Sequence, residues 1–288
     1  MLKDIKIGQI YKAHSDSYTV NIDKNSLNCG ARGVLKIKSD GFSVGDYVKV
    51  DKNTIVEVLP RKNRFIRPNV SNVDLVIAVL APEPKPDLYL LDKLCINAVK
   101  ENVDIIIVVN KQDVGDQVLE LIRNEYKDLG IEILSVSSKT GVGILELKEK
   151  LRGKLSVLAG QSAAGKTSIV NAMFGLNLKT GELSEKILRG KHTTTRSEIF
   201  EQDDIKLIDS PGFAVLDADV AVDEIIECYP EYFEVSKYCK FRGCTHISEP
   251  DCKVKELVDS GQFSKERYVR YVEIYNDIAK RRKIYEKD

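Results

Sequence analysis

The chain has 288 residues, enough for about two domains of ordinary size. Lys plus Arg and Asp plus Glu both number 44, so the formal net charge is zero, and any basic surface for a polyanionic partner must be local. No apolar run reaches about 18 residues, the length that spans a bilayer, and the N-terminal stretch has no apolar signal core. We therefore expect a cytoplasmic protein without membrane contact, whose six cysteines are reduced rather than paired in disulfides.

The first 60 residues contain short β-rich runs separated by Gly, Asn, Asp and Ser. Five strands in a segment of this length fit a small barrel, for which the OB-fold is the natural candidate. A generic β-module is the alternative. The expected strands are residues 6–13, 17–22, 32–37, 46–50 and 54–59.

A basic strip, PRKNRFIRP at residues 60–68, follows the β-rich region. One interpretation is a solvated linker. The other is an RNA contact, in which the cations meet phosphates and the aromatic ring meets a base. The residues concerned are Arg61, Lys62, Arg64 and Arg67, around Phe65.

From residue 70 to about 225, fully apolar strands alternate with segments of helical spacing. Strands that are apolar on both faces are typical of a largely parallel sheet covered by helices on both sides. The expected strands are 73–81, 104–110, 131–138 and 154–160, and the expected helices are 87–102, 118–130 and 143–151.

A phosphate-binding loop stands past the middle of the chain. The sequence VLAGQSAAGKTSIV, residues 157–170, contains G-x-x-x-x-G-K-T between an apolar strand and a helix expected at Lys166–Phe174. Its glycines let backbone N–H groups approach phosphates. Lys166 would reach the β- and γ-phosphates, and the Thr167 hydroxyl would bind Mg²⁺.

Two further motifs each end an apolar strand. KLIDSPG delivers Asp209, which can hold Mg²⁺ through water, and Gly212, whose N–H can approach the γ-phosphate. IIIVVNKQD delivers Asn110, Lys111 and Asp113. A carboxylate accepts both donors of the guanine edge, N1–H and the 2-amine, whereas adenine lacks that pair, so Asp113 predicts selectivity for guanine.

The order of the motifs is unusual. Small GTPases run phosphate loop, switch I, D-x-x-G, N-K-x-D, S-x-K, whereas here N-K-x-D comes first, followed by SVSSK at 135–139, whose backbone near Ser137 and Ser138 would meet guanine O6. This order predicts a circularly permuted GTPase domain, which preserves a sheet because domain termini often lie close together. The residues expected to contact GTP are Asn110, Lys111, Asp113, Ser137, Ser138, Gly160, Gln161, Ser162, Ala163, Ala164, Gly165, Lys166, Thr167, Ser168, Thr194, Asp209 and Gly212.

Between the phosphate loop and Asp209 lies a long polar stretch, residues 180–198, which we interpret as switch I. One threonine of Thr193–Thr195 is expected to meet Mg²⁺ and the γ-phosphate, with Thr194 as the candidate. Thr167 and Thr194 would then be the protein's direct magnesium ligands.

The catalytic group is expected to come from switch I. Many GTPases place a water-orienting Gln directly after D-x-x-G, but Phe213 stands there, and a phenyl ring cannot orient water. We therefore expect His192 to be catalytic when a partner fixes the loop. A surface histidine without that role is the alternative.

A Cys/His cluster follows the GTPase motifs. CKFRGCTHISEPDC has the pattern C-x4-C-x-H-x5-C, and four soft donors in one short stretch suit one structural, tetrahedral Zn²⁺. Redox thiols are the alternative. The expected zinc ligands are Cys239, Cys244, His246 and Cys252.

The C-terminal region has two further features. Lys237, Lys240, Phe241 and Arg242 lie within or beside the cluster and could touch RNA. The final helix carries an apolar stripe at helical spacing, which favours packing over ligand binding. Its members are Tyr268, Val272, Tyr275 and Ile278.

The permuted order, together with GQSAAGKTS, TGELSEKILRGKHTTT, DSPGF and the Cys/His cluster, resembles the small-ribosomal-subunit-dependent GTPase A family (RsgA, also called YjeQ or EngC). The resemblance covers essentially the whole chain. It implies an N-terminal OB-fold, zinc at the cluster, and a GTPase that matures the 30S subunit late in assembly and is stimulated by it. One departure is Ala163-Ala164, where Gly-Val is expected; both pairs are small.

We therefore expect a multidomain α/β protein: an OB-fold RNA-binding domain at 1–64, a circularly permuted P-loop GTPase domain at 65–225, and a zinc-binding helical domain at 226–288. The expected activity is Mg²⁺-dependent hydrolysis of GTP to GDP and phosphate by a monomer that binds the 30S subunit and its 16S rRNA. One alternative is a nucleotide-gated RNA-binding scaffold in which turnover is incidental. Another is an ATPase, which would require Asp113 to be irrelevant.

Overall fold

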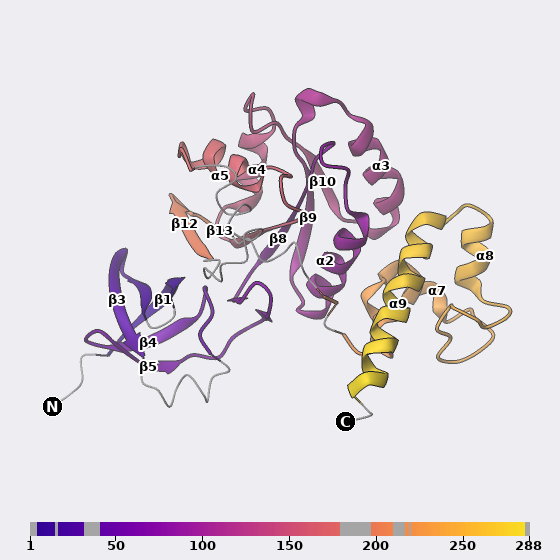
Figure 1. Cartoon of the computed structure of the whole chain (residues 1–288), viewed down its shortest axis with the longest axis horizontal. Coiled ribbons are helices and arrows are strands. Elements are labelled where there is room, and N and C mark those ends of the chain that lie inside the picture. The colour runs from indigo at the N-terminus through magenta and orange to yellow at the C-terminus, as the bar shows by residue number, and fades with distance from the viewer. Residues whose placement is uncertain are drawn as a thin grey trace.

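The computed structural model describes residues 5–14, 17–31, 41–178, 197–209, 217–218 and 220–285, with the side chains of the last helix up to residue 281. Figure 1 shows three parts: a barrel near the N-terminus, a sheet with helices on both faces, and a helical lobe near the C-terminus. Strands of the first two parts form one continuous 11-stranded sheet, in the order β10-β9-β8-β11-β13-β12-β1-β2-β3-β5-β4.

The barrel closes because β4 pairs with β1 as well as with β5. Alternate strand residues fill its interior, and Ile10, Val20 and Val48 are fully buried there. This closed five-stranded barrel confirms the predicted OB-type fold. Its strands are β1 (Ile5–Ala13), β2 (Tyr18–Ile22), β3 (Asn25–Ala31), β4 (Tyr47–Asp51) and β5 (Thr54–Val58).

The third barrel strand was not predicted. The expected strand at 32–37 lies outside the described residues, and β3 occupies Asn25–Ala31. A two-residue turn joins β2 to β3 at Asp23 and Lys24, whose φ angles are 49° and 66°. Such turns usually carry Asn or Gly, so an Asp-Lys turn gives little signal in the sequence.

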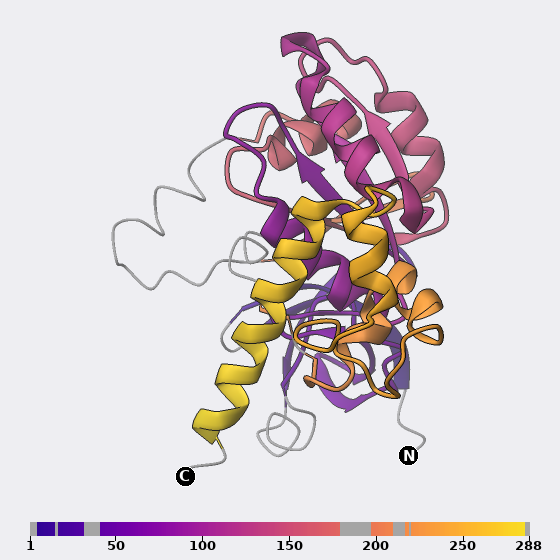
Figure 2. The same ribbon diagram turned by 90° about the vertical axis from the view of Figure 1, so that its right-hand side faces the viewer.

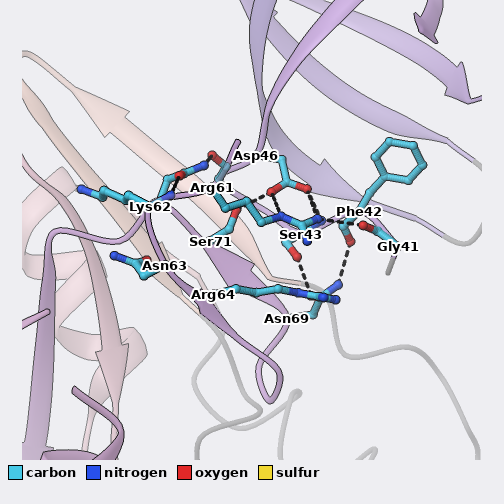
Figure 3. Close-up of polar contacts among 12 residues, drawn as sticks. Gly41, Phe42, Ser43, Asp46, Arg61, Lys62, Asn63, Arg64, Asn69 and Ser71 are labelled. Atoms are coloured by element: carbon cyan, nitrogen blue, oxygen red, sulfur yellow. Dashed lines mark hydrogen bonds and ion pairs between the residues drawn. The ribbon is translucent and has the colours of Figure 1, made fainter. Parts of the chain in front are cut away.

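The buried carboxylate of Asp46 fastens the barrel to the segment that follows it (Figure 3). Arg61 donates two hydrogen bonds to this carboxylate, from Nε at 2.6 Å and from Nη2 at 2.7 Å. The Ser71 hydroxyl donates another at 2.6 Å, and the Ser43 backbone N–H donates one at 2.8 Å. The carboxylate is therefore satisfied by charged and neutral donors together.

The basic strip at 60–68 is consequently in part structural. Arg61 neutralises a buried charge, and Phe65 belongs to a hairpin of β6 (Arg64–Phe65) and β7 (Val70–Ser71). The Phe65 ring is 4% exposed and packs in the main core. The interpretation of Phe65 as a base-stacking aromatic is therefore wrong, whereas Arg67 is exposed.

The second part confirms the predicted, largely parallel sheet. Strands β10, β9, β8, β11 and β13 run parallel, and β12 is antiparallel. Helices α2 and α3 cover one face and α4 and α5 the other, so the strands are apolar on both faces (Figure 1). The elements are β8 (Leu75–Leu80), α2 (Leu88–Lys100), β9 (Asp104–Val109), η1 (Gln112–Val114), α3 (Gln117–Tyr126), η2 (Lys127–Leu129), β10 (Glu132–Ser135), α4 (Ile144–Leu151), β11 (Leu155–Ala159), α5 (Lys166–Phe174), β12 (Glu198–Gln202) and β13 (Ile205–Asp209).

The C-terminal lobe packs around stacked and edge-to-face tyrosines, with Tyr229, Tyr232 and Tyr271 at its centre. In the last helix, Tyr271, Ile274 and Ile278 are buried, and the flanking members of the predicted stripe are partly buried against the same core. Packing by that stripe is thereby confirmed. The elements are η4 (Ile225–Cys228), α7 (Pro230–Ser236), α8 (Lys253–Asp259) and α9 (Lys265–Tyr285).

A buried ionic cluster joins this lobe to the sheet's helices. Asp92 of α2 is fully buried and accepts hydrogen bonds from Arg267 and Arg270 of α9, the latter at 2.5 Å. Arg267 also bonds Glu231 of α7 at 2.8 Å, and Arg270 bonds Glu125 of α3 at 2.7 Å. In Figure 2, α9 (yellow) passes in front of α2 (purple), in keeping with these contacts. None of the helices in the described residues has the length and apolar character needed to cross a membrane.

Candidate nucleotide-binding site and metal centre

The predicted nucleotide motifs meet at one edge of the parallel sheet. Asn110 follows β9, Val136 and Ser137 follow β10, the phosphate loop follows β11, and Asp209 ends β13. These strands are near neighbours in the order β10-β9-β8-β11-β13, and their carboxyl ends lie at the same edge. In open α/β sheets, ligands bind at this edge. The unusual motif order in the sequence therefore leaves the motifs close in space.

The glycines of the phosphate loop are required because neighbouring atoms approach their Cα atoms closely. Gly160 has a φ of +129°, and a Cβ there would lie 2.3 Å from the Val79 carbonyl oxygen. Gly165 has a φ of +92°, and a Cβ there would lie 2.3 Å from Nδ2 of Asn110. Gly165 also precedes α5, so the loop leads directly into a helix N-terminus, which favours anions.

Lys166 and Asp209 bring opposite charges together in a part of the site that is largely shielded from water. Lys166 Nζ donates to the carbonyl oxygens of Gly160 and Gln161, both at 2.8 Å, so its ammonium lies across the loop. Burial lowers the pKa of Lys166, and the Asp209 carboxylate opposes that shift. Burial raises the pKa of Asp209, opposed by Lys166 and by the Thr167 hydroxyl.

Thr167 and Asp209 offer the oxygen ligands that Mg²⁺ prefers. The Thr167 hydroxyl donates to Asp209 Oδ2 at 3.3 Å, so the two side chains already face each other. Mg²⁺ is bound through one or two protein oxygens together with water and substrate phosphates. These residues fit a magnesium ion held jointly with a triphosphate, which would neutralise charge on the phosphates.

The N-K-x-D motif is tied to the phosphate loop by its first two residues. Asn110 is buried; its Nδ2 donates to the Ala164 carbonyl at 3.1 Å and its Oδ1 accepts from the Ser138 N–H at 3.1 Å. Lys111 has a left-handed backbone with φ 63°, and its Nζ donates to the Ala163 carbonyl at 3.1 Å. These side chains act as braces between loops.

Asp113 is the carboxylate predicted to read guanine. Its Oδ1 accepts a hydrogen bond from the Ser137 hydroxyl at 2.6 Å, and this bond lowers the pKa of Asp113. Lys139 Nζ lies 3.8 Å from Oδ2 and adds to that effect. An ionised carboxylate held on a strand-end turn matches the two adjacent donors of guanine.

Ser137 and Ser138 hold neighbouring loop residues in this structure. The Ser137 N–H donates to the Val142 carbonyl at 2.9 Å, and the Ser138 N–H donates to Asn110. Their backbone contact with guanine O6 stays a prediction.

Gln161 has a structural contact that the motif alone did not reveal. Its Oε1 accepts from the Asp87 N–H at 2.6 Å, and its Nε2 donates to the carbonyls of Pro84 and Lys85 at 3.1 and 2.9 Å. The phosphate loop is thereby fixed to the turn that enters α2. These hydrogen bonds go to backbone atoms, so the residue types at 84–87 could not have predicted them.

Three predicted site residues fall outside the described residues: His192, the magnesium candidate Thr194 and Gly212. Thr193, Thr195 and Phe213 also lie outside them. Their roles stay predictions.

The Cys/His cluster is assembled as predicted. One ligand atom from each of Cys239, Cys244, His246 and Cys252 lies within 4.8 Å of the others, so the cluster can hold a metal ion. His246 Nδ1 faces the sulfurs, at 3.2 Å from Cys252 Sγ and 3.7 Å from Cys239 Sγ. Burial raises the pKa of the Cys244 thiol to about 12 and lowers that of His246. Thiolates gathered in such a place require a cation, and four soft donors fit one.

The sheet-edge site and the rearranged motif order define a class, that of circularly permuted P-loop GTPases. Comparison with known proteins narrows this class. A family model described as RsgA GTPase matches residues 58–219. The chain belongs to the RsgA GTPase family.

Similar proteins span the whole length. The chain is 38% identical to the small ribosomal subunit biogenesis GTPase RsgA of Clostridium kluyveri, over 96% of this chain and 99% of that protein. The crystal structure of YjeQ from Thermotoga maritima superposes with a TM-score of 0.78 at 32% identity, covering 96% of this chain and 99% of that one. The structure of YloQ, a circularly permuted GTPase, gives 0.76 at 28% identity, covering 96% of each chain. These matches confirm the resemblance and the permuted fold.

Proposed function

We propose that this protein binds the 30S ribosomal subunit late in its maturation and hydrolyses GTP to GDP and phosphate, with turnover stimulated by that subunit. The observation that carries the nucleotide assignment is the meeting of Asp113, Lys166, Thr167 and Asp209 at one sheet edge. The ribosomal assignment is supported by relatives named small ribosomal subunit biogenesis GTPase.

In this proposal, Asp113 reads guanine and Asn110 and Lys111 brace the loops. The loop from Gly160 to Ser168 surrounds the phosphates with N–H groups, and Lys166 neutralises them. Thr167 and Asp209 hold Mg²⁺, the first directly and the second through water, together with Thr194. Gly212 approaches the γ-phosphate, and His192 orients the attacking water.

We further propose that the Cys/His cluster binds one structural Zn²⁺. Its four donors leave no position for a reacting water, and it lies in a separate lobe from the nucleotide site. The boundaries 1–64, 65–225 and 226–288 would then separate an RNA-binding barrel, the GTPase domain and the zinc lobe. We place the protein in the cytoplasm as a monomer, where the barrel and the zinc lobe contact 16S rRNA.

The experiment compares binding with turnover. Lys166→Ala should lose GTP affinity, whereas His192→Ala should keep GTP affinity and lose 30S-stimulated hydrolysis. Co-sedimentation with purified 30S and 50S subunits should show a 30S complex that depends on a non-hydrolysable GTP analogue. A 30S complex that forms to the same extent with GDP as with the analogue would contradict the proposal. A His192→Ala protein that supports 30S maturation without turnover would favour a nucleotide-gated scaffold.

A further inference from the structure

The barrel touches the GTPase sheet beside the nucleotide site. Strand β1 pairs antiparallel with β12, the outer strand of the GTPase sheet, and Lys12 lies opposite Glu198. On the next strand, Glu198 lies opposite Asp209. Lys12, Glu198 and Asp209 therefore form one row across three strands, and Asp209 continues the row to Thr167. In Figure 1, β12 is the strand of the GTPase sheet nearest the barrel, and β13 lies on its other side.

Side chains reinforce this row. The Lys12 ammonium forms an ion pair with the Glu198 carboxylate. The Tyr11 hydroxyl donates to Glu201 at 2.5 Å, so β1 holds β12 at a second point. Lys206 of β13 donates to Gln9 at 3.1 Å and lies over the Tyr11 ring, 5.6 Å from its centre. Both strands of the β12–β13 hairpin are thus attached to the barrel.

The hairpin is the piece of chain that connects the two nucleotide-sensing segments. Its first residue, Glu198, follows shortly after the predicted switch I threonines, and its last, Asp209, begins D-x-x-G. A displacement of the hairpin must therefore move Asp209 and the end of switch I together.

The Lys12–Glu198 pair contributes little to folding. The two side chains are 41% and 32% exposed, and ion pairs at that exposure are screened by water and salt. Its loss would leave the fold intact while removing one of the attachments that hold the hairpin to the barrel. If breaking the pair changes the turnover rate, the cause would then be a changed position of the hairpin rather than a loss of stability.

We propose that Lys12 and Tyr11 of the barrel are positioning residues for GTP hydrolysis, which act by holding the β12–β13 hairpin and through it Asp209. The inference rests on the proposed function, because the barrel is the part expected to be fixed on ribosomal RNA. A barrel fixed on RNA holds β12 in register. Glu198 and Asp209, at the two ends of the hairpin, are then held for hydrolysis. In this way the 30S subunit acts on the bound nucleotide through the pairing of β1 with β12.

The test uses charge reversal and rescue in the full chain. Lys12→Glu should lower 30S-stimulated kcat by about tenfold, within the usual range of coupling between two sites, with GDP affinity and Tm unchanged. The double variant Lys12→Glu with Glu198→Lys should restore the stimulated rate. Lys49→Ala is the matched control, because Lys49 pairs with Glu57 inside the barrel at similar exposure and should change nothing.

A second readout needs no ribosome. The Mg²⁺ concentration that gives half-maximal basal hydrolysis should rise in Lys12→Glu, because repulsion from Glu198 displaces Asp209, and should return in the double variant. Equal magnesium dependence and equal stimulated rates in Lys12→Glu and Lys49→Ala would overturn the positioning role, as would failure of the double variant to recover. A wild-type protein that 30S does not stimulate would overturn the proposed partner, while the magnesium dependence still decides the role of Lys12.

Discussion

The Asp113 carboxylate accepts a hydrogen bond from the Ser137 hydroxyl at 2.6 Å, across the ends of two neighbouring strands. This bond lowers the pKa of Asp113 and fixes the orientation of its carboxylate. The residue predicted to read the base is therefore held ready as an ionised acceptor.

Replacement of Asp113 by Asn should change base selectivity. The amide offers one donor and one acceptor, which match the 2-oxo group and N1–H of xanthine rather than the two donors of guanine. GTP affinity should fall by about a hundredfold, the scale of one or two unpaired polar groups, while XTP affinity rises. Titration with fluorescent GTP, XTP and ATP measures this directly. Unchanged preference for GTP would remove Asp113 from the base contact.

Gly165→Ala should disconnect the phosphate loop from the N-K-x-D motif. The new methyl group would lie 2.3 Å from Asn110 Nδ2, so the Asn110 side chain or one of the two loops must shift, which breaks the hydrogen bonds that Asn110 makes. A displacement of that kind can lower kcat/KM by about a hundredfold. Gly130→Ala is the matched control, because its φ is also positive, at +65°, but nothing lies within 4 Å of the added Cβ. Equal activity of the two variants would show that the steric contact does not matter.

Arg61→Ala should destabilise the chain strongly. It removes two charged donors from the buried Asp46 carboxylate, and an uncompensated buried charge costs about 3–5 kcal/mol. Arg152→Ala removes ion pairs to Glu149 and Asp204 that are about half exposed and screened by water, and should destabilise the chain far less. Urea denaturation of both variants gives the comparison. Similar losses would mean that Arg61 is an ordinary surface cation, open to RNA.

Removal of the metal should unfold the C-terminal lobe selectively. Cys244 and Cys252 belong to the same core as Tyr229 and Tyr271, so loss of the ion loosens that core. A strong chelator, or Cys244→Ser, should expose the lobe to limited proteolysis while GTP binding persists. Cys228→Ser is the control, because Cys228 is buried in that lobe but lies outside the metal cluster. Full protease resistance after zinc removal would contradict a structural metal.

Sequence reasoning succeeded where local patterns carry the information. The helix at Lys166–Phe174 and the clustering of the four Cys and His side chains follow from spacing alone. It failed where the structure depends on hydrogen bonds to backbone atoms or on pairs of residues far apart in the chain. The Asp23-Lys24 turn lacks the usual glycine, and Gln161 bonds only to carbonyl and N–H groups at 84–87. The Lys12–Glu198 pairing joins residues far apart in the chain, and no periodicity records it.

The burial of Phe65 shows a further limit of composition. An aromatic among arginines and lysines is typical of an RNA-binding strip. The Phe65 ring, however, is buried in the main hydrophobic core. The neighbouring Arg61 has a buried acid as its partner in place of a phosphate. The meaning of a basic strip depends on which side chains the fold turns inward, and the sequence does not specify that.

The most direct test of the account is GTP hydrolysis by the purified protein with and without 30S subunits, at low and physiological salt, with 50S subunits as the control. The account predicts slow hydrolysis by the free protein and a large stimulation by 30S subunits alone. Equal rates with 30S, with 50S and without either, in a protein that binds GTP normally, would contradict it.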